Sequence, residues 1–159
     1  MNVSQLMCRN VVTCGPTDSL EDAAHKMWEQ DLGCLPVVDD ENRVIGVLTD
    51  RDACMAAYTQ GHSLKEIEVQ TAMARHVFTR RPTDRLQDVE AIMRAHKVRR
   101  VPIVDGNGCL VGMVSLNDLA REAASERRRR TPDIPDSEIV TTIAIIGEPR
   151  RTPKADAAE

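Results

Sequence analysis

The chain has 159 residues, 21 of them basic and 25 acidic, which gives a formal net charge of −4. This length allows one ordinary domain, or two small intertwined ones, with a real hydrophobic core. The charge creates no field that attracts nucleic acid, and one Trp, one Tyr and one Phe leave little to stack on bases. These properties exclude a dedicated nucleic-acid binder.

The five cysteines are odd in number and form no C-x-x-C pair, which argues against a disulfide framework and a standard zinc site. We therefore expect reduced thiols and no bound metal, with Cys54 and Cys109 as small buried apolar residues. There is no signal-peptide pattern, and no run approaches the roughly 18 apolar residues of a membrane span. The sequence predicts a soluble cytoplasmic protein without a membrane segment.

The sequence contains an internal repeat. Residues 7–53 (copy one) align without a gap on residues 73–119 (copy two) at a constant offset, 73 − 7 = 66. Turn residues, cap residues and apolar positions recur together, so the two copies should share one local structure. The identical pairs include Met7/Met73, Thr13/Thr79, Pro16/Pro82, Asp18/Asp84, Pro36/Pro102, Gly46/Gly112 and Asp52/Asp118.

The elements of copy one follow in chain order. Residues 11–13 predict a short strand that a turn closes at Gly15 and Pro16. Asp18, three residues before Glu21, predicts the N-cap of a helix that reaches about Gln30, because apolar residues recur there at helical spacing. Two apolar runs, 35–38 and 44–48, flank a polar turn and predict a hairpin, after which a second helix begins at Thr49.

Copy two repeats this order, with its hairpin turn at 105–108 and its second helix starting at Ser115. Each copy is thus β-α-β-β-α over about 50 residues, which is too small to bury its helices and sheet alone. We predict an α+β fold in which the two copies pack on each other with pseudo-two-fold symmetry.

The remaining segments complete the predicted organisation, which is 1–60 for motif one, 61–72 for a packed linker, 73–125 for motif two and 126–159 for a C-terminal extension. The arginines at 127–130 and the prolines that follow indicate a solvated hinge. Residues 138–146 carry an apolar stripe that favours a helix over a strand, although β-branched residues keep a strand open. Residues 150–159 are expected to fray.

The chemistry of the repeat concentrates at residues 46–52 and 112–118. Each stretch reads glycine, two apolar residues, a hydroxyl (Thr49 or Ser115), two variable residues and a carboxylate (Asp52 or Asp118). This pattern predicts a buried strand that ends in a helix start, where free backbone N–H groups can receive an anion or a ribose. The same hydroxyl and carboxylate also make a simple capping box, which needs no ligand.

With the repeat established, the chain resembles a tandem pair of CBS domains, the Bateman module, over about residues 1–125. The matching residues are Thr13 with Pro16, the run 35–39 and the stretch 46–52, each with its copy-two counterpart. The resemblance implies two CBS motifs around a cleft with up to two sites for an adenosyl ligand, commonly AMP, ADP or ATP, with room for Mg²⁺ beside the phosphates.

The resemblance also implies roles for individual residues. Asp52 and Asp118 would accept hydrogen bonds from ribose hydroxyls, and Thr49 and Ser115 would meet ribose or phosphate. Backbone groups of residues 13–16 and 34–37, and of their copy-two equivalents, would hold the adenine between apolar side chains. The expected site one comprises Thr13, Pro16, Cys34, Leu35, Val37, Thr49, Arg51 and Asp52, and the expected site two comprises Thr79, Pro82, Arg99, Arg100, Val101, Ile103, Ser115, Asn117 and Asp118.

The two expected sites differ in charge. Copy two carries basic residues where copy one has none, and only Arg51 favours site one. If these side chains face the cleft they would hold phosphates, so site two would take the more highly phosphorylated nucleotide; otherwise they are a solvated surface. The basic residues are Arg80, Arg81, Lys97, Arg99 and Arg100.

No nucleophile–base pair and no Walker-type glycine loop is present, so we predict a regulatory module without enzymatic activity. It would sense an adenine nucleotide and signal to an unidentified partner protein by a shape change. The family resemblance also implies a homodimer. The alternatives are a ligand-independent interaction scaffold and a sensor of S-adenosylmethionine or NAD. For Trp28 we favour a packing role over a subunit contact.

Overall fold

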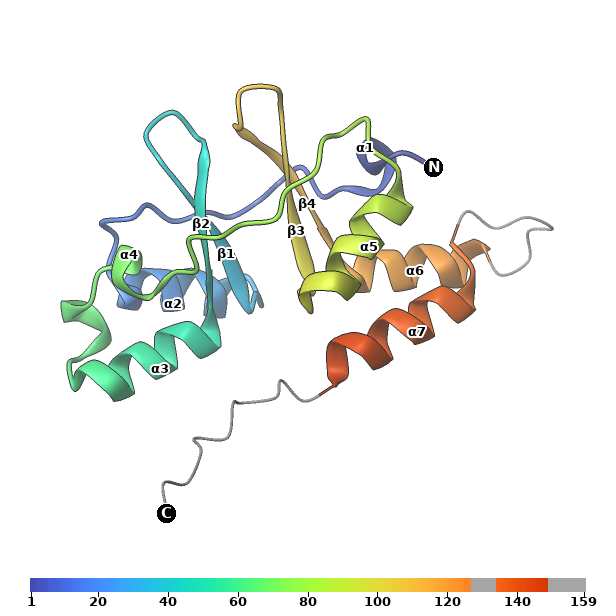
Figure 1. Cartoon of the computed structure of the whole chain (residues 1–159). Helices are drawn as coiled ribbons and strands as arrows, with labels where there is room; N and C mark the ends of the chain where they lie inside the picture. The colour runs from blue at the N-terminus through green and yellow to red at the C-terminus, as the bar shows by residue number, and fades with distance from the viewer. Residues whose placement is uncertain (127–133, 149–159) are drawn as a thin grey trace, which may run out of the picture.

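The structure is a computed structural model, which describes residues 1–126 and 134–148. Two β-hairpins stand side by side, each with a pair of helices on its outer flank (Figure 1). The hairpin turns contact each other, since the Val44 N–H donates to the Gly108 carbonyl (3.2 Å) and the Leu110 N–H to the Asn42 carbonyl (2.9 Å). The predicted α+β architecture of two paired motifs is confirmed.

Corresponding elements of the two copies begin 66 positions apart. Copy one contains α2 (Leu20–Glu29), β1 (Cys34–Val38), β2 (Val44–Thr49) and α3 (Asp50–Gln60). Copy two contains α5 (Leu86–His96), β3 (Arg100–Val104), β4 (Leu110–Ser115) and α6 (Leu116–Glu126). Both hairpins are antiparallel and carry an irregularity at the same place, before Val38 and before Val104. The sequence repeat is therefore a structural repeat.

The two copies exchange their preceding segments. The short helix α1 (Val3–Leu6) packs into the core of copy two, and α4 (Val69–Ala72), which follows the 3₁₀ turn η1 (Leu64–Glu66), packs into the core of copy one. Val3 and Val69 are fully buried there, and each burial is worth about 1.5–3 kcal/mol. Matching hydrogen bonds of 2.9 Å fix both segments, because the N–H groups of Val3 and Val69 donate to the Asp84 and Asp18 carbonyls.

This exchange explains the glycine of each repeated stretch. The Met73 side chain lies over Gly46 and the Met7 side chain over Gly112, so that an added Cβ would come within 2.5 Å and 2.7 Å of the respective sulfurs. The chain that carries Met73 also pairs with β2 through Ala74 and Val47, and the chain that carries Met7 pairs with β4 through Cys8 and Met113. Only glycine lets these chains cross so closely.

Two local predictions are wrong. Residues 11–13 do not form a strand; the pairing at that place is reduced to an isolated parallel bridge of Cys14 with Val37, and of Arg80 with Ile103 in copy two. The first helix is capped by Ser19 rather than Asp18, since Ser19 Oγ accepts from the Asp22 N–H at 3.0 Å. Asp18 closes the preceding turn instead, where it accepts from the Gly15 N–H.

The C-terminal extension contains α7 (Asp136–Gly147), so the preference for a helix at this place is confirmed. α7 lies against α5 and α6 of copy two (Figure 1). The predicted hinge at 127–130 and the predicted frayed tail at 150–159 lie outside the described residues. Within the described ranges, no helix has the length and apolar character needed to cross a bilayer.

Candidate functional site

The two strand-to-helix corners predicted from sequence are present and closely alike. Asp52 Oδ2 accepts from the Thr49 hydroxyl (2.6 Å) and the Thr49 N–H (3.0 Å), and Thr49 Oγ1 accepts from the Asp52 N–H (3.1 Å). Ser115 and Asp118 repeat these contacts at 2.6, 2.8 and 3.2 Å. The capping box is therefore formed without a ligand, and it uses only one oxygen of each carboxylate.

The second carboxylate oxygen distinguishes the corners. Asp118 Oδ1 pairs with the guanidinium of Arg121, whose side chain is 77% exposed. In copy one the equivalent position holds Met55, which carries no charge, and among the described hydrogen bonds and ion pairs none uses Asp52 Oδ1. A ribose hydroxyl that approaches Asp118 must share its acceptor with Arg121, whereas one that approaches Asp52 finds a free oxygen.

The backbone segments around Thr13 and Thr79 lie beside the hairpins. The Cys14 N–H donates to the Pro36 carbonyl (3.1 Å), and the Arg80 N–H to the Pro102 carbonyl (3.2 Å). These bonds use backbone carbonyls on the edges of β1 and β3 that do not pair with β2 and β4. The turns also anchor the exchanged segments, because the Pro16 and Pro82 carbonyls accept from N–H groups of α4 and α1, each at 2.9 Å.

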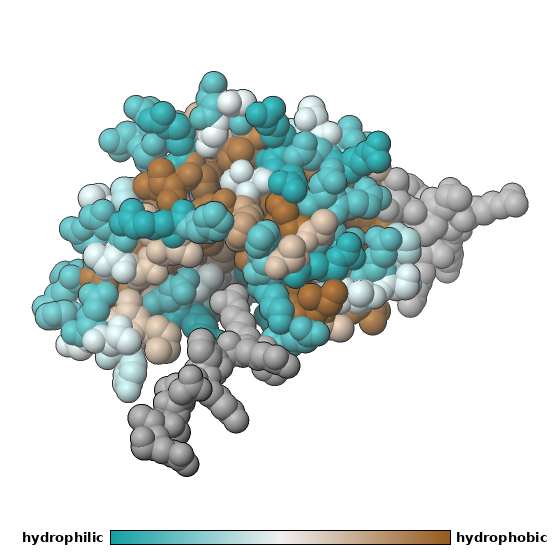
Figure 2. Space-filling view, viewed as in Figure 1, coloured by the Kyte–Doolittle hydropathy of each residue, from teal (hydrophilic) through white to brown (hydrophobic). Residues whose placement is uncertain are grey.

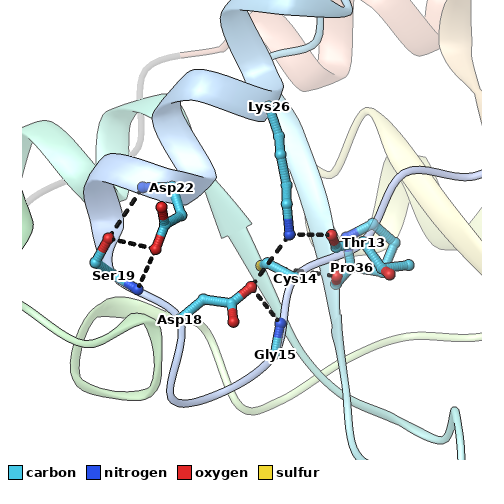
Figure 3. Close-up of polar contacts among 8 residues, drawn as sticks. All are labelled: Thr13, Cys14, Gly15, Asp18, Ser19, Asp22, Lys26 and Pro36. Carbon is cyan, nitrogen blue, oxygen red and sulfur yellow. Dashed lines mark hydrogen bonds and ion pairs between the residues drawn. The ribbon is translucent and has the colours of Figure 1, made fainter.

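A basic side chain contacts each of these segments, Lys26 in copy one and Arg80 in copy two, and the sequence did not predict the contact of Lys26. Lys26 Nζ reaches from α2 to the Thr13 carbonyl and to Asp18 Oδ2, each at 3.2 Å (Figure 3). In copy two the equivalent of Lys26 is Ile92, and Arg80 Nη1 donates to the Thr79 carbonyl instead. The repeat alignment could have indicated this role, because it places Lys26 opposite Ile92, which is buried, and so marks a lysine on the inner side of its helix.

The charge of Arg100 acts on Cys34 of copy one, although the sequence assigns Arg100 to site two. Burial raises the pKa of the Cys34 thiol to about 11, with Arg100 lowering it and Asp52 and Asp50 raising it. Cys34 and Arg100 are repeat equivalents that begin β1 and β3. The thiol stays protonated at neutral pH.

The other basic residues of copy two do not converge on one site. Lys97 pairs with Glu148 after α7 at 3.1 Å, and Arg80 lies 4.0 Å from Asp84. Arg81 is exposed, and its N–H donates to Asp84. Arg99 is exposed next to the start of β3. Part of the basic set predicted to hold phosphates is thus engaged with neighbouring carboxylates.

The apolar residues predicted to enclose the adenine are core residues. Four of these residues of β1 and β3 are fully buried in the two hydrophobic cores, so their side chains are not exposed to a ligand: Leu35, Val37, Val101 and Ile103. Arg51 and Asn117, the variable positions of the two corners, are exposed on the first turns of α3 and α6. The corner hydroxyls and carboxylates are half-buried.

A groove of about 530 Å³ lies elsewhere, between α2 and α3. None of the predicted ligand-site residues lines it. Cys54 lines it and is exposed, so the prediction of a buried Cys54 is wrong. Trp28 also lines it and is 85% exposed, which overturns the packing role predicted for this side chain. Among the described residues, no group of three or more His, Cys, Asp or Glu side chains is placed to hold a metal ion.

The sequence and the fold are similar to those of known proteins. The family model described as CBS domain matches twice, over residues 3–58 and 64–125. The CBS domain-containing protein YhcV of Bacillus subtilis is 35% identical over 119 residues, which is 75% of this chain and 83% of that protein. An uncharacterized protein of Methanopyrus kandleri is 30% identical over 119 residues, 75% of this chain and 61% of that protein.

A solved structure is also similar. The structure of CBSX2 in complex with AMP has a TM-score of 0.70 and 27% identity, and the match covers 80% of this chain and 98% of that one.

Proposed function

The chain belongs to the CBS domain family, and on that premise we propose that it is a regulatory module that binds an adenine nucleotide between its two motifs and signals occupancy to a partner protein. A ligand that bridges two packed copies favours the arrangement in which both contacts are made, so binding shifts the balance between conformations. We propose that the module acts in the cytoplasm, as a homodimer and without catalytic activity of its own.

The observation that carries this proposal is the half-buried carboxylate at each corner. Asp52 uses Oδ2 for the capping box and keeps Oδ1, and a carboxylate oxygen is a suitable acceptor for vicinal ribose hydroxyls. The first N–H groups of α3 are already bonded to the Gly33 carbonyl, Asp50 Oδ1 and Thr49 Oγ1, so we propose that basic side chains hold the phosphates. The AMP complex of CBSX2 supports an adenine nucleotide as the ligand class.

We propose the ligand contacts as predicted from the sequence, with two changes. We assign Arg100 to site one, because its charge acts on Cys34 of that site. We remove Lys97 from the basic residues expected to hold phosphates, because it pairs with Glu148. The proposal that site two prefers the more highly phosphorylated nucleotide then depends on Arg80, Arg81 and Arg99.

Isothermal titration calorimetry on the full chain tests the proposal, with AMP, ADP and ATP, each with and without Mg²⁺. We expect Asp52→Ala and Asp118→Ala each to abolish one binding event. The milder Asp52→Asn and Asp118→Asn keep an oxygen for the capping box, which separates lost binding from a frayed helix. Asp50→Ala removes an exposed charge from the same corner and serves as the matched control. Loss of ATP binding in Asp52→Ala alone would contradict the phosphate preference of site two.

The second candidate is a ligand-independent scaffold, which the complete capping boxes favour because they account for both corners without a ligand. A thermal-shift screen with AMP, ADP, ATP, S-adenosylmethionine and NAD separates the two, since a ligand that binds the folded state at 100 times its Kd adds about 2.7 kcal/mol to its stability. No shift with any of them at millimolar concentration would support the scaffold.

A further inference from the structure

The helix α7 is seated on copy two by specific contacts of its inner face. Ile139 and Ile146 pack against the hydrophobic core of copy two. The Thr142 hydroxyl donates to the buried Glu90 carboxylate of α5. Lys97, at the end of α5, pairs with Glu148 just beyond α7. These contacts fix which face of α7 points away from its own chain.

The outer face of α7 is apolar and open. Val140 is 65% exposed and Ile143 is 49% exposed, and Ala144 and Gly147 are exposed as well. These four residues follow the spacing i, i+3, i+4, i+7, so they form one stripe, the outer stripe of α7. Figure 2 shows hydrophobic surface over this helix, at the lower right. A helix that is apolar on both faces is normally covered on both.

The groove between α2 and α3 is the repeat equivalent of the seat of α7. Six groove residues correspond, 66 positions on, to residues on or directly after α5 and α6: Ala24 to Glu90, Trp28 to Arg94, Asp31 to Lys97, Ala53 to Leu119, Cys54 to Ala120 and Ala57 to Ala123. Because α2/α3 and α5/α6 have the same fold, a face that accepts a helix in copy two has its counterpart in copy one. The counterpart is open among the described residues.

The chemistry of the groove selects the outer stripe over the inner face. Ala24 stands where Glu90 holds Thr142, so the inner face would lose its buried hydrogen bond in the groove. Asp31 stands where Lys97 pairs with Glu148, so a carboxylate would meet a carboxylate. The small side chains of the groove instead let an apolar helix approach closely, and the outer stripe brings no polar group that needs a partner.

α3, which lines the groove, and α7, which carries the outer stripe, lie at the lower left and the lower right of Figure 1. A two-fold rotation that brings α7 of one copy over the α2/α3 groove of another forms two equal contacts. We propose that the groove receives the outer stripe of α7 from a second copy of this chain. This interface rests on the homodimer proposed above and does not depend on nucleotide binding.

Two exposed aromatic side chains, one in the groove and one directly after the groove residue Ala57, fit this role. Trp28 on α2 and Tyr58 on α3 are 85% and 81% exposed. Large aromatic residues dominate the energy of protein interfaces, because they bury much area at a small entropy cost. Trp28 lines the groove itself, so it is the anchor expected to cover α7 of the second copy.

Sedimentation velocity on the full chain tests the interface. Wild type is expected to be a dimer at micromolar concentration. Ile143→Glu and Trp28→Arg, which gives copy one the residue that copy two has, are expected to raise the dimer Kd at least tenfold; both residues are exposed, so the fold should persist. Thr141→Glu, on the flank of α7, is the matched control and should leave the dimer intact.

Mixing the two variants distinguishes this interface from one in which two grooves meet. A mixture of Ile143→Glu and Trp28→Arg has one intact contact, so heterodimers should form more readily than either homodimer. If wild type is monomeric, the homodimer itself is wrong. If wild type is a dimer that Ile143→Glu does not weaken, only the α7 interface is overturned.

Cross-linking locates the contact directly. Cys54 lines the groove, and Ala144→Cys places a thiol in the outer stripe, so oxidation of this variant should give a covalent dimer with a Cys54 to position 144 disulfide, identified by peptide mass spectrometry. The additional substitution Cys54→Ala should abolish it. A dimer linked through position 144 on both chains, or no covalent dimer, would overturn the proposed arrangement.

Discussion

Copy one and copy two have the same elements at the same offset, yet their outer surfaces are finished differently. α7 covers the α5/α6 face of copy two, where Glu90 bonds to Thr142 of α7 and Lys97 pairs with Glu148 just after it. The α2/α3 face of copy one instead has small apolar residues and an open groove. Their corners differ as well. Arg121 pairs with an oxygen of Asp118, whereas its equivalent in copy one, Met55, carries no charge that could pair with Asp52. The repeat thus fixes the scaffold, and single positions give each half a different surface.

The largest effects should come from the two cores and should be shared. Leu20→Ala and Leu86→Ala remove equivalent, fully buried side chains, and each should cost about 2–5 kcal/mol of folding stability. Because each core contains a segment that belongs to the other half, we expect both variants to lower one common unfolding transition. Hydrogen exchange of the amides of each core reports on the two copies separately, and far-ultraviolet circular dichroism reports on the whole chain. Transitions that separate in Leu86→Ala would show that the halves unfold independently.

The crossing points should be the next most sensitive places. Gly46→Ala and Gly112→Ala push a Cβ against Met73 and Met7, and overpacking of this kind costs about 1–3 kcal/mol. Adding Met73→Ala to Gly46→Ala should recover part of this cost, whereas Met7→Ala should not, because it belongs to the other crossing. Urea unfolding of the single and double variants measures this coupling. Equal recovery by both methionine substitutions would contradict the crossed arrangement.

Exchanging the residues at positions 55 and 121 sharpens the contrast between the corners. Arg121→Met frees Asp118 Oδ1 and should strengthen nucleotide binding at site two, and Met55→Arg should weaken it at site one. Arg121 is exposed, so we expect a change of about 0–1 kcal/mol, at most about fivefold in Kd. Calorimetry measures each site separately: Arg121→Met is combined with Asp52→Asn, which disables site one, and Met55→Arg is combined with Asp118→Asn, which disables site two. Opposite signs would show that the arginine holds phosphate rather than competing with ribose.

The smallest effect should be the pH dependence of the α7 contact. Burial, the charge of Glu90 and a hydrogen bond with Glu90 raise the pKa of Glu138 above its usual value, with Arg94 opposing. A raised folded-state pKa stabilises the docked helix below the ordinary glutamate pKa, and this stabilisation is lost as the pH rises through the raised pKa. Hydrogen exchange of the α7 amides, corrected for intrinsic rates, should therefore show less protection toward neutral pH.

Glu138→Gln tests this origin, because glutamine keeps the hydrogen-bonding capacity and cannot ionise. The variant should protect α7 more than wild type at pH 7 and should flatten its pH profile. Asp136→Asn removes a neighbouring exposed carboxylate and serves as the control. An unchanged profile in Glu138→Gln would assign the pH dependence to another group.

The sequence alone determined the repeat and most of what depends on it. The apolar pattern and the turn residues are local signals, and each occurs twice, 66 residues apart. They therefore predict both hairpins, the second helix of each copy and both capping boxes. The pairing of Thr49 with Asp52 is a contact three residues apart, which the sequence specifies directly. The cap at Ser19 was missed because Asp18 and Ser19 are both good cap residues and only the turn geometry separates them.

Tertiary structure decided what lies far apart along the chain. Nothing local places Val3 in the core of copy two or Met73 over Gly46, because these contacts depend on how two already formed halves cross. The same holds for the exposure of Trp28: its helical position suits burial against a neighbour, and whether a neighbour is present depends on α7, which covers only the other half. Local pattern fixes the units, and long-range packing decides which of their faces remain open for function.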